Sequence, residues 1–208
     1  MILLSQNFEI EFKNILSAEK YQEVFEKEFA KTPATKHKII QTNYYFDTIE
    51  TALKNQGAAL RIRVTDSYQE LTFKVPHNDF LTETNIPLTN EQVNEIIRLK
   101  QIILSLYVSA EDQLPDLENI DKETVFRLFN AFETKRFEKQ VGEHLIVLDQ
   151  TTFQNGSIDY ELEVESTDAT LGKEFFDQFL ENHSIPVHPA APKIARAQER
   201  AASDPYSK

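Results

Sequence analysis

Several residue types that define common protein classes are absent or scarce in this 208-residue chain. It contains no cysteine and only four glycines. Without cysteine, disulfide bonds, thiolate catalysis and zinc sites with cysteine ligands are excluded. With so few glycines and no low-complexity tract, the sequence has no recognisable interdomain linker, so we expect a single domain over residues 1–208.

Long hydrophobic runs and glycine-rich phosphate motifs are also missing. No apolar run approaches the ~20 residues of a membrane-spanning helix, and the opening Met1–Leu4 is far too short for a secretory signal. Neither a P-loop nor a Rossmann glycine motif occurs, and the five histidines have no zinc-like spacing. We therefore expect a cytoplasmic protein with no membrane partner.

Positive charge is in short supply. The chain has 22 Lys and Arg residues against 34 Asp and Glu residues, which gives a formal net charge of −12. Such a chain repels nucleic acid phosphates on average, so we expect no nucleic acid partner. Any polyanion that it does bind must be met by a local cluster of basic residues.

Eight segments have the residue pattern of β-strands. They are Phe8–Lys13, His37–Phe46, Ala59–Thr65, Tyr68–Val75, Thr82–Leu88, Ala131–Val141, His144–Phe153 and Ser157–Ser166. Short turns join several of them, and Asn155-Gly156 predicts a type I′ hairpin, in which both central residues have positive φ. Sequential hairpins predict an antiparallel sheet.

Amphipathic segments between the strands predict helices. They are Ala18–Lys31, Glu50–Gln56, Asn90–Leu99, Thr170–Asn182 and Lys193–Ala202. The pattern of residues 100–130 is also helical, with a break at Leu114-Pro115, so we expect a helical insertion at about 89–130 and a C-terminal helix at about 193–202. Strands and helices together predict an α+β fold.

Charged residues repeatedly share one face of a predicted strand whose other face is apolar. Arg61 and Arg63 alternate with apolar residues in one strand, and four acidic residues from Asp159 to Glu165 do so in another. One interpretation is the solvent-exposed side of a half-buried sheet. The other is a shared lumen, because eight strands are enough to close a barrel. The alternation fits both a closed barrel and a curved open sheet.

If these charges converge, their chemistry points to one class of ligand. Clustered carboxylates repel one another and are relieved by a hard divalent cation such as Mg²⁺ or Mn²⁺. Clustered arginines pair well with phosphate oxygens. A chain of phosphates that chelates a metal ion satisfies both groups.

At this point the sequence resembles a known family. Glu9-Ile10-Glu11-Phe12-Lys13 resembles the ExExK signature of the CYTH superfamily, the triphosphate tunnel metalloenzymes. Further matches follow in the family's order: Tyr45–Thr48, Leu60–Arg63, Thr72–Lys74, Lys135-Arg136, Leu148-Asp149, Glu161–Glu165, and Lys193 with Arg196. The resemblance runs from about residue 6 to 197, and the layout is most similar to the small bacterial, thiamine-triphosphatase-like members.

The resemblance implies an eight-stranded antiparallel closed β-barrel with a charged lumen and helices packed outside, which binds a triphosphate with Mg²⁺ or Mn²⁺. It implies metal binding by Glu9, Glu11, Glu161, Glu163 and Glu165. It implies substrate binding by Lys13, Arg61, Arg63, Lys74, Arg136, Lys193 and Arg196, and catalytic roles for Glu9, Glu11, Lys13 and Asp149. In two places the chain departs from the family pattern. Pro192 stands where many relatives have serine, and the late acidic strand has one extra carboxylate, which leaves open the pair that binds metal.

The resulting hypothesis is a metal-dependent hydrolase that acts on inorganic tripolyphosphate or on a nucleoside or thiamine triphosphate and releases phosphate inside the tunnel. One alternative is a class IV-type adenylyl cyclase, and another is a non-catalytic module that binds polyphosphate or nucleotides. We expect a small-molecule triphosphate as the partner and a monomer or homodimer. Asp47 fits two roles equally, a cap for the short helix after it and a metal ligand.

Overall fold

The computed structural model of the protein describes residues 5–30, 38–77, 80–108 and 114–202, and side chains within these ranges except those of 5–9, 77, 80, 201 and 202. The chain folds into two compact units. Unit 1 comprises residues 1–8 and 42–131, and unit 2 comprises residues 9–41 and 132–208. Strands β1 (Ser5–Leu16), β2 (Lys38–Asp47) and β7 (Val125–Val141) have residues in both units.

Unit 1 is built on the antiparallel strands β2, β3 (Ala59–Val64), β4 (Gln69–His77) and β5 (Phe80–Pro87). One face of this sheet is apolar and fully buried, with Leu60, Ile62, Leu71, Phe73 and Ile86 each 0% exposed. The helices α2 (Ala52–Asn55) and α3 (Asn90–Leu99) contribute Leu53, Val93 and Ile96 to the same core. The other face is therefore left for the polar residues of the alternation.

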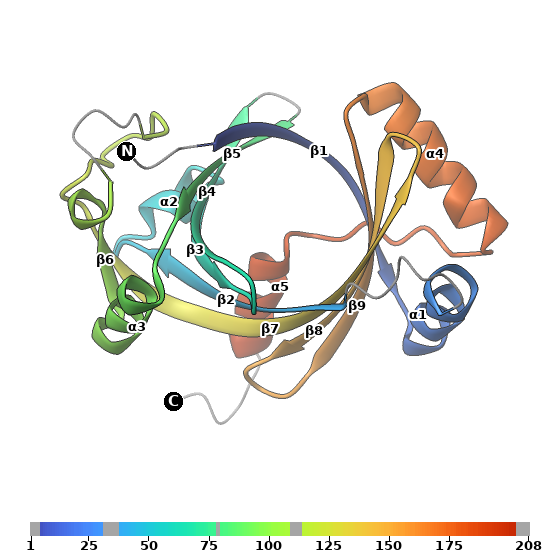
Figure 1. Ribbon diagram of the computed structural model, residues 1–208, viewed down its shortest axis with the longest axis horizontal. Helices are drawn as coiled ribbons and strands as arrows, with labels where there is room; N and C mark the ends of the chain where they lie inside the picture. The colour runs from blue at the N-terminus through green and yellow to red at the C-terminus, as the bar shows by residue number, and fades with distance from the viewer. Residues whose placement is uncertain (1–4, 31–37, 78–79, 109–113, 203–208) are drawn as a thin grey trace. The chain divides into compact units, whose positions relative to one another are not determined.

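Unit 2 is built on β1, β9 (Ile158–Ser166), β8 (His144–Phe153) and β7, again antiparallel. The helices α1 (Ala18–Val24) and α4 (Ala169–Asn182) lie on the same side of these strands (Figure 1). Together with the π-helical turn η1 (Phe25–Phe29) they bury the apolar face of the sheet. The helix α5 (Lys193–Ala202) follows a loop and occupies the range that the alanine-rich pattern predicts.

Local sequence signals account well for several boundaries. Thr89 and Gln92 form the predicted capping box, since the Thr89 hydroxyl accepts from the Gln92 N–H and the Gln92 side chain accepts from the Thr89 N–H. Ser17 caps α1 and Asp168 caps α4. Within the described residues, no helix is both long and apolar enough to cross a membrane.

The predicted helix over 100–130 is wrong. Helix α3 ends at Leu99, with Lys100 in the left-handed region, and the short strand β6 (Gln101–Ile103) and a 3₁₀ turn, η3 (Leu104–Leu106), follow it. Strand β6 pairs with the start of β7, and the buried Ile102 lies opposite Phe126. A short apolar run suits a buried strand as well as a helix, so periodicity alone misassigned it. Residues 109–113 lie outside the described part of the chain.

The predicted type I′ turn at Asn155-Gly156 is also wrong. Only Gly156 has a positive φ, of 79°, and its N–H bonds the carbonyl of Phe153. The Asn155 side chain instead accepts from the N–H of Ser157 at 3.0 Å. An asparagine that bonds the backbone two residues on stabilises a three-residue turn that needs glycine at one position only.

The α+β class and the curled antiparallel sheet are as expected, with nine described strands in place of eight. The additional strand is β6, and the other strands match the predicted segments, although β7 begins six residues early, at Val125 instead of Ala131. Each unit contains a curved sheet, and a closed barrel is not shown.

Candidate functional site

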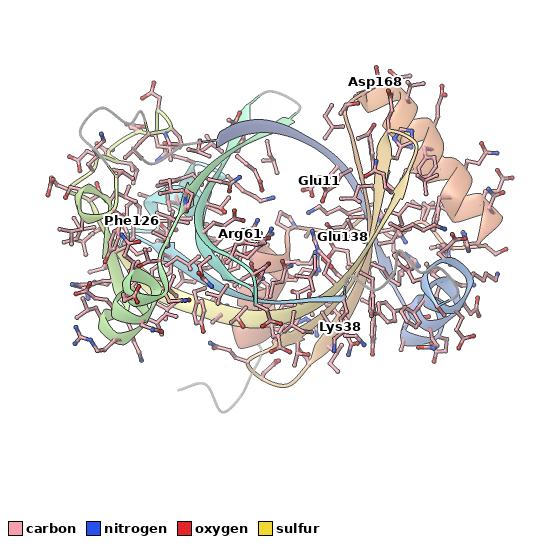
Figure 2. The ribbon with its side chains drawn as sticks, in the orientation of Figure 1. Glu11, Lys38, Arg61, Phe126, Glu138 and Asp168 are labelled. Atoms are coloured by element: carbon pink, nitrogen blue, oxygen red, sulfur yellow. The ribbon has the colours of Figure 1, made fainter. Side chains whose placement is uncertain are left out.

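The charged residues of unit 2 gather on the face of its sheet opposite the one that α1 and α4 cover. The strand register places Lys13 opposite Glu163, Glu11 opposite Glu165, and Asp149 opposite both Glu161 and Arg136. Residues opposite one another across antiparallel strands share a face. Figure 2 shows Glu11 and Glu138 on the side of the strands away from α1 and α4. The predicted acidic and basic residues of this unit whose side chains are described are therefore brought together.

Lys193, the first residue of α5, contacts three carboxylates. Its Nζ lies 3.0 Å from Asp149 Oδ2 and 3.0 Å from Glu161 Oε1, and it also pairs with Glu163 Oε1. These carboxylates are 0%, 1% and 2% exposed. The C-terminal helix thus supplies a buried counter-charge to the sheet.

Arg136 binds two of these carboxylates, Asp149 and Glu163. Its Nε and Nη2 donate to the two oxygens of Asp149 at 2.9 and 2.8 Å, and Nη2 also donates to Glu163 Oε2 at 2.9 Å. Its Nη1 lies 3.7 Å from Glu165. The bidentate pair holds the guanidinium plane in one orientation.

Three further cations, Lys13, Arg196 and Arg200, complete the network. Lys13 Nζ lies 2.7 Å from Glu11 Oε1 and 3.6 Å from Glu163 Oε1. From α5, Arg196 Nε donates to Asp159 Oδ2 at 2.8 Å, while its Nη2 donates to Glu161. Arg200, one helical turn further on, pairs with Asp159 as well.

These contacts shift the pKa values of the buried groups. Burial alone would raise the pKa of Glu163, but Lys13, Lys193 and Arg136 together lower it well below the usual value. Burial and the adjacent Glu163 carboxylate raise the pKa of Glu161 despite its contact with Lys193. The pKa values of these two neighbouring carboxyl groups therefore shift in opposite directions, as expected for like charges that share a site.

Unit 1 has a smaller charged cluster on its own polar face. Arg61, Arg63 and Lys74 share this face, and Lys74 Nζ lies 2.5 Å and Arg61 Nη2 3.6 Å from Glu83 Oε1. Burial alone would raise the pKa of Glu83, but Lys74 and Arg61 lower it to about 2. Our sequence reasoning missed Glu83. Its position directly opposite Lys74 in the β4–β5 hairpin is the signal that could have found it.

Two residues that the sequence suggested as metal ligands, Glu9 and Asp47, are not among the contacts described above. Glu9 lies in β1, but its side chain is outside the described ones. Asp47 is a cap: its carboxylate accepts from the backbone N–H groups of Thr48, Leu53 and Lys54 at 2.7, 2.9 and 3.1 Å. Both carboxylate oxygens of Asp47 accept hydrogen bonds from the backbone around α2. Of the two roles that the sequence allowed, helix cap and metal ligand, Asp47 therefore has that of a cap.

The donor set in unit 2 has the chemistry that a hard divalent cation requires. Carboxylate oxygens of Glu11, Glu161, Glu163 and Glu165 share one face, and Mg²⁺ and Mn²⁺ prefer such ligands. Among the described side chains, no group of three acidic or histidine residues has the arrangement that would hold a metal ion. Glu161 and Glu163 are held instead by Lys193, Arg136 and Lys13.

Comparisons with known proteins find similarity over most of the chain. The model of the CYTH domain family matches residues 7–197. The chain is 35% identical over 202 residues to the "Putative triphosphatase YjbK" of Bacillus subtilis (strain 168), a match that covers 94% of this chain and 97% of the relative.

Solved structures are similar over most of the chain. A "putative adenylate cyclase" from Bacillus halodurans superposes with a TM-score of 0.75 at 26% identity, over 92% of this chain and 97% of that one. A "putative adenylyl cyclase" from Hippeastrum, described as having a dominant triphosphatase activity, has a TM-score of 0.74 at 22% identity, over 92% of this chain and 96% of that one. The latter likeness shows the fold.

Proposed function

The chain belongs to the CYTH domain family, and on that premise we propose that it is a divalent-metal-dependent hydrolase that cleaves a phosphoanhydride bond of a triphosphate. The family match and the relative named as a triphosphatase support this reaction class. The Hippeastrum protein, with its dominant triphosphatase activity, supports hydrolysis over cyclisation.

The observation that carries the proposal is the buried charge network of unit 2. Asp149, Glu161 and Glu163 are at most 2% exposed and are balanced by lysine and arginine side chains. Burying so many charges carries a large desolvation cost, and apolar residues of similar volume would often be as stable or more so. A binding function for a charged ligand explains why the face is charged.

The basic residues would bind the phosphate chain. In unit 2 these are Lys13, Arg136, Lys193 and Arg196, and in unit 1 Arg61, Arg63 and Lys74. Guanidinium and ammonium groups held in place before the reaction stabilise the negative charge that builds up on the leaving phosphates.

The acidic residues would hold Mg²⁺ or Mn²⁺. The candidates are Glu9, Glu11, Glu161, Glu163 and Glu165. When bound, the cation would neutralise phosphate oxygens and make water a better nucleophile. Asp149 would act through its neighbours, since both of its oxygens already orient Arg136 and Lys193. We therefore place it as a positioning residue within the catalytic set.

The finer features of the architecture are part of the same proposal. We propose one CYTH domain over residues 1–208. The supporting observation is the single family match over residues 7–197. A cytoplasmic location and a monomer or homodimer stay predictions.

One product analysis tests the function. The protein is incubated with tripolyphosphate, ATP or thiamine triphosphate, each with Mg²⁺, Mn²⁺ or EDTA, and the products are separated. Orthophosphate that appears only with a metal is the expected result. Pyrophosphate together with cyclic AMP would identify the cyclase alternative, and tight binding without turnover would identify a binding module.

A further inference from the structure

Three uncharged polar atoms on the charged face of unit 1 are buried without a hydrogen-bond partner. They are Asn43 Oδ1 on β2, Thr72 Oγ1 on β4 and Asn85 Oδ1 on β5. Thr72 is 0% and Asn43 2% exposed. Buried polar atoms almost always have partners in native proteins, so three orphans on one sheet face call for an explanation.

The orphan atoms are interleaved with the basic residues of this unit. Thr72 lies directly opposite Arg61 on one side and Asn85 on the other, and Asn43 lies opposite Arg63. Residues two apart along a strand also share a face, which places Lys74 beside Thr72. The face therefore combines three cations with three neutral hydrogen-bonding side chains. We call these three side chains, Asn43, Thr72 and Asn85, the neutral row.

The chemistry of the neutral row differs from that of the cations around it. A carboxamide Oδ1 can only accept a hydrogen bond, whereas the threonine hydroxyl can donate or accept. An ionised phosphate chain offers only acceptors, so it can satisfy Thr72 but neither of the two asparagine oxygens. The group that completes the neutral row must carry O–H or N–H donors.

We propose that the neutral row is a subsite for the hydroxyl- or amino-bearing organic part of a triphosphate, so that the substrate class is an organic triphosphate and not inorganic tripolyphosphate. This inference rests on the proposed function, because it takes the adjacent Arg61, Arg63 and Lys74 to bind the phosphates. Their long side chains surround the row and must turn aside as the ligand binds, with the phosphates competing with Glu83 for Lys74.

Calorimetric titration with ATP and with tripolyphosphate tests the subsite. Both ligands are titrated in EDTA, where absence of phosphate release is checked, into the unmodified protein and into Thr72→Val, Asn43→Leu and Asn85→Leu. Each variant removes one hydrogen bond to the organic group, so the Kd for ATP should rise about five- to tenfold. In Asn43→Leu and Asn85→Leu the Kd for tripolyphosphate should stay within about twofold, since it presents no donor to an asparagine oxygen.

Thr84→Val is the matched control. Thr84 is also 0% exposed and its hydroxyl is also without a partner, but it lies opposite Phe73 on the apolar face of the same sheet. The change in shape and burial is the same as in Thr72→Val, so thermal melting should shift similarly in both. Of these two threonine variants, only Thr72→Val should raise the Kd for ATP.

Two outcomes would overturn the inference. Equal losses of affinity for ATP and tripolyphosphate in the two asparagine variants would show that the neutral row contacts phosphate, and unchanged affinities for both ligands would show that water alone satisfies it. If the unmodified protein binds neither ligand, and also releases no phosphate from them with a metal, the proposed function itself fails. The two failures are thus told apart by the unmodified protein.

Discussion

Lys193 is the residue on which the unit 2 network converges. Lys193→Met keeps the length of the side chain but removes a cation from among Asp149, Glu161 and Glu163. Because the carboxylates stay buried, we expect the free energy of unfolding to fall by about 3 to 5 kcal/mol, measured by urea denaturation at pH 7.

Lys173→Met is the control for that prediction. Lys173 also pairs with a carboxylate, that of Asp177, but both side chains are more than half exposed. Exposed pairs of this kind contribute little to stability. A similar small loss in both variants would mean that Arg136 and Lys13 alone neutralise the buried carboxylates.

Glu9 and Glu11 are the two glutamates of the ExExK motif that are predicted to bind metal, and of these only Glu11 has a described side chain. Glu11→Gln preserves shape and leaves a polar partner for Lys13, so folding should be nearly unaffected. Turnover should fall by roughly two orders of magnitude or more, because a neutral amide is a poor ligand for a divalent cation. Phosphate release and thermal melting are the two measurements.

Glu138 provides the comparison for Glu11. It shares the charged face of unit 2, is 31% exposed and lies 3.8 Å from Arg136, but it is outside the proposed metal set. Glu138→Gln should keep activity within about twofold. Comparable activity in the Glu11 and Glu138 variants would remove Glu11 from the metal site.

At the scale of elements, helix α4 approaches β1 and β9 closely enough to require a glycine. A Cβ at position 172 would lie 2.6 Å from Ser166 Cβ and 2.9 Å from the Phe12 ring. We expect Gly172→Ala to destabilise the protein by about 1 to 3 kcal/mol through overpacking. This loss would outweigh the gain of about 1 kcal/mol in helix propensity.

Thermal and urea unfolding of Gly172→Ala check this prediction. Glu174→Ala, at an exposed position of the same helix, is the control and should change stability by about 0.5 kcal/mol or less. A stabilised Gly172→Ala variant would show that α4 can move away from the sheet at no cost.

Elements also show where local sequence signals suffice. The Thr89–Gln92 capping box placed α3 because its hydrogen bonds join residues three apart. Strand β6 was missed because its pairing with Val125–Arg127 joins residues over twenty positions apart. Its apolar residues are equally suited to a helix until that partner is known.

At the scale of the whole molecule, stability should depend on pH through Glu83. Its pKa is about 2 in the folded state, against a reference value of 4.5. A depressed carboxylate pKa contributes stability that is fully present above about pH 4.5 and is lost as the pH falls towards 2. The contribution is on the order of 3 kcal/mol at most.

Urea unfolding of the unmodified protein and Glu83→Gln between pH 2 and 7 measures this contribution. The unmodified protein should be the more stable of the two at pH 6, and the difference should shrink below pH 4.5 and vanish near pH 2. A difference that is independent of pH would mean that Glu83 acts by packing and not by charge.

The alternation of charged and apolar residues was readable from the sequence, because the two faces of a strand follow from a local period of two residues. It separated the charged face from the core in β3, β4 and β9, and in unit 2 it put Glu11 with Lys13, and the late glutamates with one another, on one side of their strands. Asp149 was indicated only by the family resemblance, and the strand register showed that these sides form one face. Tertiary structure alone decided which charges pair. Lys193 meets Asp149, Glu161 and Glu163 only because α5 returns to the sheet, and Glu83 meets Lys74 only through the register of its hairpin. An ion pair depends on distances between elements, and no local pattern encodes those distances.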